Sequence, residues 1–531
     1  MGVIVNGQTY SLQPSKDISV LHSGIAPSGA YSYVKLNQDN VIVEMESFQR
    51  QPDQDLETTP NEFYNRTWNT MNMTDLPTLL QPLPSVHRVN SSLHAKNQIP
   101  TIYLSGNQSQ IELMHSNTTL DTKVTMNMHF IETEKTTSVE DVEVKLAGRS
   151  SKWLDKLSYG IKIKKGDNLY GYRRLKLRAL RSDPSYVREI LCYDMMKSMG
   201  LPVSGASYAR VIMNDQPLGL FLMIEAYKND WYKNEFGDGE KLEHGRGITY
   251  QGAGMLSDLS YYGDNNVSAY DGPYKIEEDA DKKHSDDGET SDFQKLMNFT
   301  QFLSGAPTTS NDAATIWNEY IDMDSVIRSF VIEIVGGLSD GYIANANNFF
   351  LYDNLAERRF TYLAADFDTT LGNTFVKLED MWSGNYSQYP GFSMRPLAQK
   401  MIQVPEFKAQ FEQLLLNTTQ RLIDPEFINP RIDDLVKMIR QDVEWDIGLP
   451  KMNPNATIDT ETAEYFKDPK DLPPPMDWDT IKDIQKRSHV DFDIAVNGPT
   501  HSISLPGVKE WFANQSKAIQ DYFVQQPPLY S

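Results

Sequence analysis

Cysteine is almost absent from this chain of 531 residues, and Cys192 is the only one. A single cysteine excludes an intramolecular disulfide, so the fold has to be stabilised by packing. Positive charge is also scarce: 50 Lys and Arg residues stand against 72 Asp and Glu residues, which gives a formal net charge of -22 at pH 7. Because so acidic a surface repels phosphate groups, we expect no nucleic acid among its partners.

Long apolar runs are missing as well. No stretch of about 18 apolar residues occurs, so we expect no transmembrane segment. Residues 1–6 lack the charged and apolar regions of a signal peptide, so none is visible in this chain. Eleven Asn-X-Ser/Thr sequons nevertheless favour a glycoprotein that is secreted or displayed on a cell or spore surface. They begin at Asn65, Asn72, Asn90, Asn107, Asn117, Asn266, Asn298, Asn385, Asn417, Asn455 and Asn514.

Several catalytic motifs are absent. The chain has no P-loop sequence, no His-Glu-X-X-His and no Cys-X-X-Cys, and its nine His residues are scattered. These absences argue against a P-loop nucleotide site and against a zinc centre. Residues 337–341 fit the Gly-X-Ser-X-Gly pattern of serine hydrolases, but that pattern needs a strand before the serine and a helix after it. The predicted order here is helix and then strand, so we favour another role for this segment.

Composition and periodicity divide the chain into four parts. Residues 1–60 contain short alternating strands between turns, which predicts a small β-sandwich. Residues 61–100 are rich in Pro, Asn, Gln and Thr, which predicts a linker. Strands return over residues 101–235, and residues 236–531 are mainly helical after an acidic, Gly- and Tyr-rich insertion over 236–292. The chain is therefore predicted to be of the α+β class.

One helix interrupts the strands of residues 101–235. We expect it from about Ser185 to Met199, because Pro184 favours its first turn and Gly200 ends it. Apolar residues at three- and four-residue spacing predict further helices in the last part of the chain. These cover residues 291–303, 324–335, 396–422 with a break at Pro405, 430–443 and 508–523.

Oxygen ligands are concentrated in two segments, residues 338–352 and 362–372. Asp366 and Asp368 follow an apolar run that predicts a strand, and in a strand their two carboxylates would point to the same side. Carboxylates held that close favour a cation between them, and Mg²⁺ (or Mn²⁺) bound to nucleotide phosphates is one candidate. Two ordinary turn and cap carboxylates before Gly372 are the alternative.

Asp340 lies in the first of these segments, ahead of a predicted strand over residues 349–352. In protein kinases an Asp accepts the proton of the substrate hydroxyl, and an Asn five residues later binds metal. Asn345 has that spacing, whereas Asn347 and Asn348 lie nearer the start of the strand. An Asp-Gly turn followed by an Asn-rich loop is the alternative.

Basic residues suited to phosphate precede these segments. Lys162 and Lys176 lie in predicted strands, and Glu189 lies on the helix that follows. A strand Lys paired with a helix Glu holds the α- and β-phosphates in protein kinases, although any exposed strand can alternate with Lys. Arg149, in the segment Gly148-Arg149-Ser150-Ser151, offers a guanidinium and neighbouring amides to phosphate, with a plain surface turn as the alternative.

The order of these segments resembles that of the CotH family, in particular its fungal, Mucorales-type branch. No single segment is specific, but their order is, and the similarity covers nearly the whole chain. The matching segments are Gly148-Arg149-Ser150-Ser151, Lys156, Lys162, Arg188-Glu189, Gly200-Leu201-Pro202, residues 219–225, Asp340-Gly341-Tyr342, residues 348–352 and residues 366–372. Residues 5–8 and 61–66 look similar to runs in the fungal members.

The resemblance implies an atypical protein-kinase-like fold with two lobes behind the N-terminal β-sandwich. Residues 101–235 would form the N-lobe and residues 236–531 the C-lobe. Bacterial members are spore-coat proteins that phosphorylate Ser residues of other coat proteins, so ATP and Mg²⁺ are the implied cofactors. Fungal members are known as cell-surface or spore-surface proteins, some of which act as adhesins or invasins toward host receptors.

The same resemblance assigns roles to individual residues. Asp340 takes the catalytic role, Asn348 and Asp366 bind metal, and Asp368 supports them. Lys162 is the first candidate for the phosphate contact, with Glu189 as its partner. Three further residues of the matching segments and strands are expected at the cofactor site: Lys176, Arg149 and Glu225.

Two functions of different classes follow. The first is a protein kinase that transfers the γ-phosphate of ATP to Ser or Thr of surface or spore-coat proteins. The second is a surface adhesin or invasin in which a kinase-like scaffold binds a host receptor. The sequons, the acidic charge and the Tyr- and Gly-rich residues 250–274 favour the second.

Overall fold

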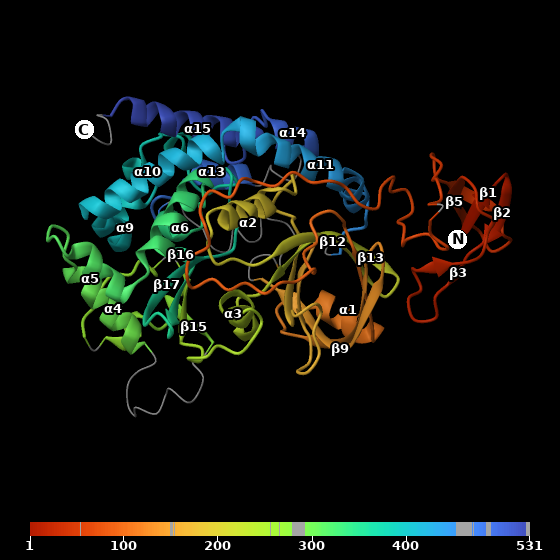
Figure 1. Cartoon of the computed structure of the whole chain (residues 1–531), viewed down its shortest axis with the longest axis horizontal. Helices are drawn as coiled ribbons and strands as arrows, with labels where there is room; N and C mark the ends of the chain where they lie inside the picture. Colours follow the sequence, from red (N-terminus) through yellow and green to blue (C-terminus); the bar gives the residue numbers. More distant parts are fainter. Residues whose placement is uncertain are drawn as a thin grey trace.

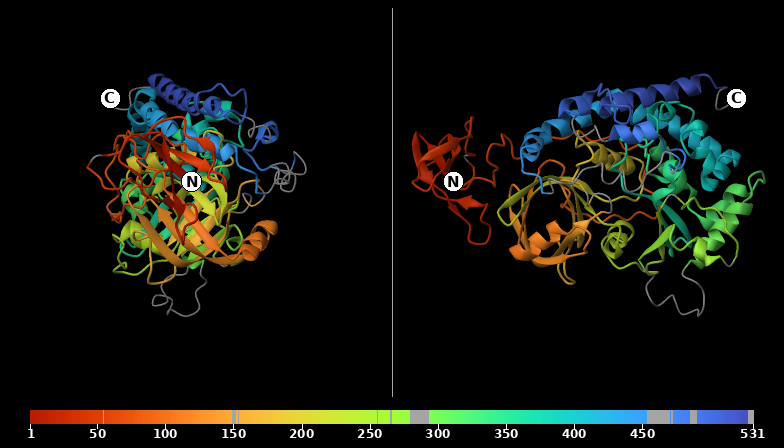
Figure 2. Two further views of the ribbon diagram at one scale, coloured as in Figure 1. Left: turned by 90° about the vertical axis from the view of Figure 1, so that its right-hand side faces the viewer. Right: turned by 180° about the vertical axis from the view of Figure 1, so that it is seen from behind.

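The structure is a computed structural model of mixed α+β class (Figure 1). It describes residues 1–53, 55–148, 152, 154–254, 256–264, 266–278, 293–452, 470, 472–484 and 490–526. A small N-terminal sheet, a closed β-barrel and a second sheet follow one another along the molecule. Helices of the C-terminal half cover the second sheet and reach back to the barrel (Figures 1 and 2).

The N-terminal strands form one antiparallel sheet in the order β2-β1-β5-β6. These strands are β1 (Gly2–Val5), β2 (Gln8–Ser11), β5 (Tyr31–Leu36) and β6 (Ile42–Met45). A separate ribbon pairs β3 (Gln13–Pro14) with β4 (His22–Ser23). We expected a β-sandwich, but the ribbon is too short to cover the sheet, and every side chain of β6 is exposed. The small core of this sheet centres on Val3, Val5 and Tyr31.

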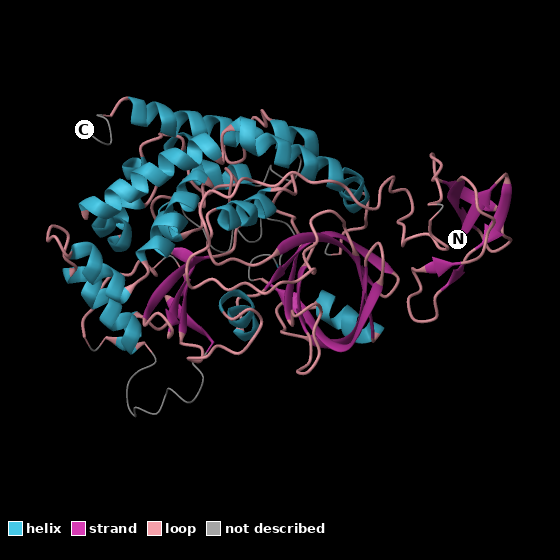
Figure 3. Ribbon diagram, viewed as in Figure 1, coloured by secondary structure: helices cyan, strands magenta, loops and turns pink. Residues whose placement is uncertain are grey.

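Seven strands form a closed barrel in the order β10-β11-β13-β12-β7-β8-β9 (Figure 3). They are β7 (Thr101–Gly106), β8 (Lys123–Ile131), β9 (Thr136–Ala147), β10 (Ser158–Lys162), β11 (Arg174–Arg178), β12 (Ala206–Met213) and β13 (Gln216–Glu225). β7 and β12 pair in parallel, and the other neighbours pair antiparallel. Inward side chains such as Ile102, Leu177 and Phe221 fill the barrel, and helix α1 (Gln108–Ser116) adds Ile111 and Met114.

Helix α2 (Arg188–Ser198) lies between β11 and β12 in the chain, within the predicted range. Its apolar side chains share a second, larger core with the outward residues Leu220 and Leu222 of β13. Asp183 accepts a hydrogen bond from the Arg188 backbone N–H (2.9 Å) and contacts the Arg188 side chain (2.5 Å). The buried Arg188 guanidinium also donates to the carbonyl oxygens of Leu371 (3.3 Å) and Pro506 (2.5 Å). These bonds tie the start of α2 to the segment that follows Asp366 and Asp368.

An extended connector links the N-terminal sheet to the barrel. Over the described part of residues 51–100 it has no helix or strand. It runs along the end of α2, where the Leu79 N–H donates to the Ser198 carbonyl and the Leu83 N–H to the Gly200 carbonyl, each at 2.9 Å. The connector therefore packs directly on the turn that ends α2.

A substitution at Gly200 in that turn tests this packing. Its φ is +66°, and a Cβ there would lie 2.2 Å from the Gln81 carbonyl oxygen of the connector. Gly200→Ala combines a left-handed alanine with a backbone clash, so we expect the free energy of unfolding to fall by about 2–5 kcal/mol in urea titrations. Gly166→Ala is the matched control, because Gly166 has φ +103° with nothing within 4 Å of its Cβ position. It should lose only about 1–2 kcal/mol. Equal losses in the two variants would contradict the packing described.

The second sheet has the order β15-β14-β16-β17 and is antiparallel throughout. Its strands are β14 (Thr249–Ala253), β15 (Tyr274–Glu278), β16 (Asn347–Asn354) and β17 (Arg359–Ala364). Smaller helices around it are α3 (Asn229–Phe236), η2 (Val267–Ala269), α4 (Gln294–Gly305), α5 (Ala313–Tyr320), α7 (Tyr342–Asn345), α8 (Leu378–Met381), η4 (Tyr386–Gln388), η5 (Phe392–Met394) and α9 (Pro396–Met401). The described residues contain no helix long and apolar enough to cross a membrane.

Long helices pack on this sheet and on each other. They are α6 (Met323–Val335), α10 (Pro405–Arg421), α11 (Pro425–Ile447) and α15 (Val508–Val524), with the short α13 (Trp478–Ile484) and α14 (Phe492–Asn497) between the last two. α6 packs against β17, α10 packs against α6 and α15, and α11 reaches the barrel strand β13. Apolar spacing of three to four residues predicted the four long helices, and Pro405 predicted the break before α10. The short α13 and α14 were not predicted.

Helix α15 holds the end of α6 in place. The Trp511 indole N–H donates to the Val335 carbonyl (3.0 Å), and the Gln515 side chain donates to the Ile334 carbonyl (2.7 Å). These bonds satisfy carbonyls that the end of a helix leaves free. The Trp511 ring also packs on Gly337 and Gly372, where any Cβ would lie within 3 Å of it. Both glycines have positive φ, so no other residue fits easily there.

Candidate active site

The two oxygen-rich segments meet where β16 begins and β17 ends. Phe349 of β16 pairs with Ala364 of β17, and the Ala365 N–H donates to the Asn348 carbonyl at 3.0 Å. Asp340 lies in the turn between α6 and α7, and Asp366 and Asp368 follow β17. Sheet pairing therefore brings residues 340–348 and 366–368 to the same end of the second sheet.

Asp340 is the acceptor for three asparagine side chains. Asn345 and Asn347 donate to its Oδ1 at 2.7 and 3.0 Å, and Asn348 donates to its Oδ2 at 2.6 Å. Burial raises the pKa of Asp340 to about 6, although the Asn347 and Asn345 amides pull it down. The Asp340 carboxylate is thus fixed in orientation and titrates close to neutral pH. Asn345, which has the kinase-loop spacing, orients Asp340 in this structure.

Several residues of this site have left-handed backbone conformations without being glycine. They are Ala346 (φ 48°), Asn348 (φ 50°), Asp366 (φ 59°) and Leu371 (φ 51°). Such conformations cost about 1–3 kcal/mol each and persist only where surrounding contacts hold them. One holding contact is Arg395, which donates to the carbonyls of Tyr342 (2.9 Å), Ile343 (3.1 Å) and Ala344 (2.9 Å) in α7. Strain concentrated in this way is typical of a functional site.

The Glu333 side chain of α6 links helix α7, which follows Asp340, to strand β17. Its buried carboxylate accepts hydrogen bonds from the Ile343 N–H (2.8 Å) and from the Tyr362 hydroxyl (2.7 Å). Burial raises the pKa of Glu333 to about 7. Sequence reasoning missed this residue, although a lone Glu in the apolar helix segment 323–335 was a visible signal.

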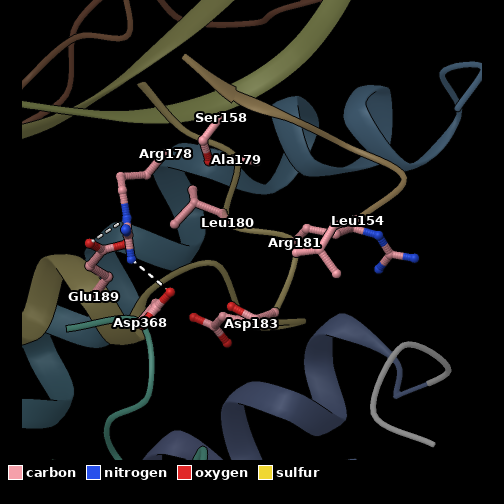
Figure 4. A pocket seen from close by; sticks show the side chains of 10 residues that line it. Leu154, Ser158, Arg178, Ala179, Leu180, Arg181, Asp183, Glu189 and Asp368 are labelled. Atoms are coloured by element: carbon pink, nitrogen blue, oxygen red, sulfur yellow. Dashed lines mark hydrogen bonds and ion pairs between the residues drawn. The ribbon is translucent and has the colours of Figure 1, made fainter. Parts of the chain in front are cut away.

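Arg178, the last residue of β11, joins the barrel to the acidic segment. Its guanidinium lies 2.9 Å from Glu189 Oε1 of α2, 2.7 Å from Asp366 Oδ1 and 2.9 Å from Asp368 Oδ2. Figure 4 shows Arg178 between Glu189 and Asp368, on the wall of a small pocket. Lys176 lies 3.7 Å from Asp366 Oδ2 and adds a second cation. One arginine therefore contacts three carboxylates from two distant parts of the chain.

The charges of this cluster, together with burial, shift the pKa values of its members. Although burial raises the pKa of Asp366, the Arg178 and Lys176 cations hold it well below its usual range. Burial and the neighbouring Asp366 charge raise the pKa of Asp368. Burial also raises the pKa of Glu189 to about 7, despite the Arg178 guanidinium beside it. Arg178 itself has a pKa well above the usual range, because its three carboxylate neighbours outweigh its burial.

The partner of Glu189 is Arg178, so the predicted pairing with Lys162 is wrong. Lys162 stands opposite Arg174 in the β10–β11 register, four residues along β11 from Arg178. Its side chain forms no hydrogen bond or ion pair with any residue that the structure describes. The alternating sequence pattern predicted that the basic residues share one face of the strands. It could not show which of them contacts α2. Arg178 was visible as the last member of that alternating run.

Two other predicted cofactor residues are not brought to this cluster. Glu225 is buried opposite Leu175 in β11, where it accepts a hydrogen bond from Asn234 at 2.8 Å. Burial raises its pKa to about 9, so it is protonated at neutral pH and poorly suited to a metal or a lysine. Arg149 lies outside the described residues.

The donor set suits a hard divalent cation. The side chains of Asp366 and Asp368 are 36% and 37% exposed, so a ligand can reach them. Asp366 Oδ1 is buried 2.7 Å from the Arg178 guanidinium, so a ligand would reach the exposed remainder of the Asp366 carboxylate. The described residues hold no cluster of three or more His, Cys, Asp or Glu for a metal. Magnesium sites often use one or two carboxylates and complete the shell with phosphates and water, so two Asp residues with the Asn348 amide oxygen fit that pattern.

Comparisons with known proteins show the family of this chain. The profile of the CotH kinase protein family matches residues 144–464, which include Arg178, Asp340 and Asp366. Invasin CotH3 of Rhizopus delemar is 27% identical over 467 residues, which cover 85% of this chain and 74% of that protein. Inner spore coat protein H of Bacillus subtilis is 24% identical over 314 residues, 58% of this chain and 78% of that protein. Since the family profile covers more than half of the sequence, this chain belongs to the CotH kinase protein family.

Proposed function

We propose that this chain is an atypical protein kinase that transfers the γ-phosphate of ATP to Ser or Thr hydroxyls of surface or spore-coat proteins. The observation that carries the proposal is the contact of Arg178 with Glu189, Asp366 and Asp368, beside the fixed carboxylate of Asp340. Protein kinases need the same four elements: a cation on a strand, its helix glutamate, a metal-binding aspartate and a base. The family name supports the same activity.

We propose that the barrel and the helical part act as the two lobes of this kinase. Arg178 and Glu189 come from the barrel and α2, whereas Asp340 and Asp366 lie in turns beside the second sheet. The Arg178 contacts cross between these two parts. Nucleotide would bind at this junction, as in two-lobed kinases.

Arg178 would contact the phosphates of the nucleotide. A guanidinium presents a planar set of donors that matches phosphate oxygens, and it stays charged at any physiological pH. Arg178 would keep its hydrogen bond to Glu189 (3.1 Å to Oε2) while part of its contact with Asp366 passes to the metal and phosphates. Lys176, whose ammonium group is nearby, adds positive charge on the same side.

Mg²⁺, when bound, neutralises the charge that develops on the transferred phosphoryl group. Asp366, Asp368 and the Asn348 amide oxygen would hold it. Asp340 would accept the proton of the substrate hydroxyl, and the three Asn amides keep its carboxylate in a single orientation. With a pKa of about 6, Asp340 is mostly ionised at pH 7 and ready for this task.

Calorimetric titration of the purified full chain with Mg-ATP tests the proposal. We expect saturable binding that requires the metal and falls at least about tenfold in Asp366→Asn, because a hydrogen-bonding amide is a weaker magnesium ligand than a carboxylate. Asp521→Asn is the control, since Asp521 is paired only with the exposed Lys517. Absence of Mg-ATP binding to the folded wild type would contradict the proposed kinase.

A second candidate function is recognition of a host or cell-surface receptor, at the surface of a cell or spore. Two relatives from Rhizopus delemar that cover 85% and 86% of this chain are named invasins, which supports it. In the Tyr- and Gly-rich residues 250–274, Tyr250, Tyr270 and Tyr274 are buried, so the exposed Tyr262 is the better placed to contact a receptor. If receptor binding is separate from catalysis, Asp366→Asn should bind host cells as the wild type does.

A further inference from the structure

A second cavity lies behind α2, away from Asp340 and Asp366. It has a volume of about 150 Å³, well above the roughly 10–15 Å³ that a single water needs. Its walls come from the connector, α2, β12 and α11. Four segments far apart in sequence thus enclose one space whose lining is largely polar and charged.

The charges that line this cavity do not balance. Arg431 of α11 is paired with Asp194 of α2, with Nη2 and Oδ2 2.8 Å apart, and Lys96 is paired with Asp75 in the connector. The Lys197 side chain of α2 forms no hydrogen bond or ion pair with any part of the chain that the structure describes. Burial lowers the pKa of Lys197, although the nearby Asp194 charge raises it. The Lys197 ammonium group therefore has no carboxylate within ion-pair distance among the described residues.

His94 adds a second unsatisfied group to the same lining. Its Nδ1 lies 3.0 Å from the Ser207 hydroxyl, whereas its Nε2 is buried and has no partner among the described residues. Burial lowers the pKa of His94 to about 3, so the ring is neutral. When Ser207 donates to Nδ1, the ring hydrogen is on Nε2, which then needs an acceptor.

We propose that this cavity binds a small oxyanion, such as inorganic phosphate or a small carboxylate, through the Lys197 ammonium group and the His94 Nε2–H. A partly buried cation without an ion pair and a buried ring nitrogen without a hydrogen-bond partner favour a ligand that has negative charge and acceptor oxygens. An apolar ligand would leave both unsatisfied, and a cation would be repelled by Lys197.

Helix α2 connects this cavity to the candidate active site. Ile190, Asp194 and Lys197 lie on one face of the helix and line the cavity. From the same helix, Glu189 contacts Arg178, and the Tyr193 ring packs edge-on against Phe367 with ring centroids 4.9 Å apart. A ligand in the cavity therefore touches the helix that holds Arg178 beside Asp366. The proposed binding does not depend on the kinase activity.

Thermal unfolding of the full chain in increasing inorganic phosphate, at constant ionic strength set with NaCl, tests this site. We expect a saturable rise of the unfolding midpoint, because a ligand that binds the folded state stabilises it. Lys197→Met should shift the midpoint upward without phosphate, since a partly buried ammonium group without an ion pair is removed, and should weaken phosphate affinity at least tenfold. Lys437→Met is the matched control: Lys437 is exposed on α11 outside the cavity, so affinity should stay within twofold. Acetate in place of phosphate shows whether carboxylates bind as well.

Three outcomes would overturn the proposal: no stabilisation by phosphate or acetate, equal stabilisation of wild type and Lys197→Met, or loss of phosphate binding in Lys176→Met alone. The last would assign the anion to the cluster around Asp366. If Lys197→Met does not fold, amine labelling of the wild type gives the answer by mass spectrometry. Phosphate should slow labelling of Lys197 at least fivefold, and an unchanged rate would reject the site. Mg-ATP titration is a separate experiment, so failure of the kinase proposal remains distinguishable.

Discussion

Replacing Arg178 by methionine is expected to lower the free energy of unfolding by about 3–5 kcal/mol, the loss typical of a buried ion pair with one partner removed. Arg178 is almost fully buried and contacts Glu189, Asp366 and Asp368, so its removal leaves three carboxylates close together without a counter-ion. Their mutual repulsion and the burial of Glu189 both oppose folding. Urea titration monitored by tryptophan fluorescence measures the change.

Two control variants test whether the loss of stability in Arg178→Met comes from its buried ion pairs. Arg178→Lys keeps the charge but loses the planar set of donors, so we expect an intermediate loss. Lys145→Met removes a cation from an exposed pair with Asp121, where about 0–1 kcal/mol is expected. Mg-ATP affinity should fall in Arg178→Met and stay unchanged in Lys145→Met. If Arg178→Met is as stable as the wild type, the three ion pairs do not hold the two halves of the site together.

The second large effect is expected at Asp340. Asp340→Asn removes the proton acceptor, and loss of a general base typically lowers the rate about 10²–10⁴-fold. Mg-ATP affinity should change little, because the metal ligands Asn348, Asp366 and Asp368 remain. Phosphate transfer to the chain itself or to a Ser-rich basic peptide, followed with labelled ATP, gives the rate. Full activity of Asp340→Asn would remove Asp340 from the mechanism.

The pH dependence gives an independent check on the same residue. The pKa of Asp340 is raised by burial to about 6, and the base acts in its ionised form. The rate should therefore rise with pH through about 6 and level off above it. Because the folded-state pKa lies above the ordinary value of 3.8, the contribution of Asp340 to stability is largest at low pH and is lost as the pH rises through 6. Asp340→Asn should remove both dependences, in rate and in unfolding free energy.

Local patterns predicted most elements but not how distant elements join. Periodicity predicted α6, α10, α11 and α15, whereas Pro184 and Gly200 predicted α2. It could not show that β9 pairs with β10 and β7 with β12, which closes the barrel. Such pairings depend on contacts between residues far apart in the sequence, and nothing in the alternation of a single strand encodes its neighbour.

The prediction that Asp366 and Asp368 point toward one cation rested on strand geometry, and the structure corrects that geometry. Asp366 and Asp368 do approach one cation, but they follow the end of β17, and Asp366 has a left-handed backbone. A turn, and not strand alternation, therefore sets the direction of their carboxylates. The basic partner was assigned to Lys162, because alternation cannot rank residues on one face by their distance to a helix. Arg178 could be identified only from the β10–β11 register and the position of α2.

The contacts that Trp511 makes at the end of α6 determine when the candidate site can form during synthesis. Residues 337 and 372 flank the segments that carry Asp340 and Asp366, and both pack under a tryptophan that is translated more than a hundred residues after them. On the ribosome, the end of α6 stays without its cover until that tryptophan has emerged. The nascent barrel can fold early, since domains generally fold as their sequence becomes available. The candidate site around Asp340 therefore cannot be completed until synthesis has passed residue 511.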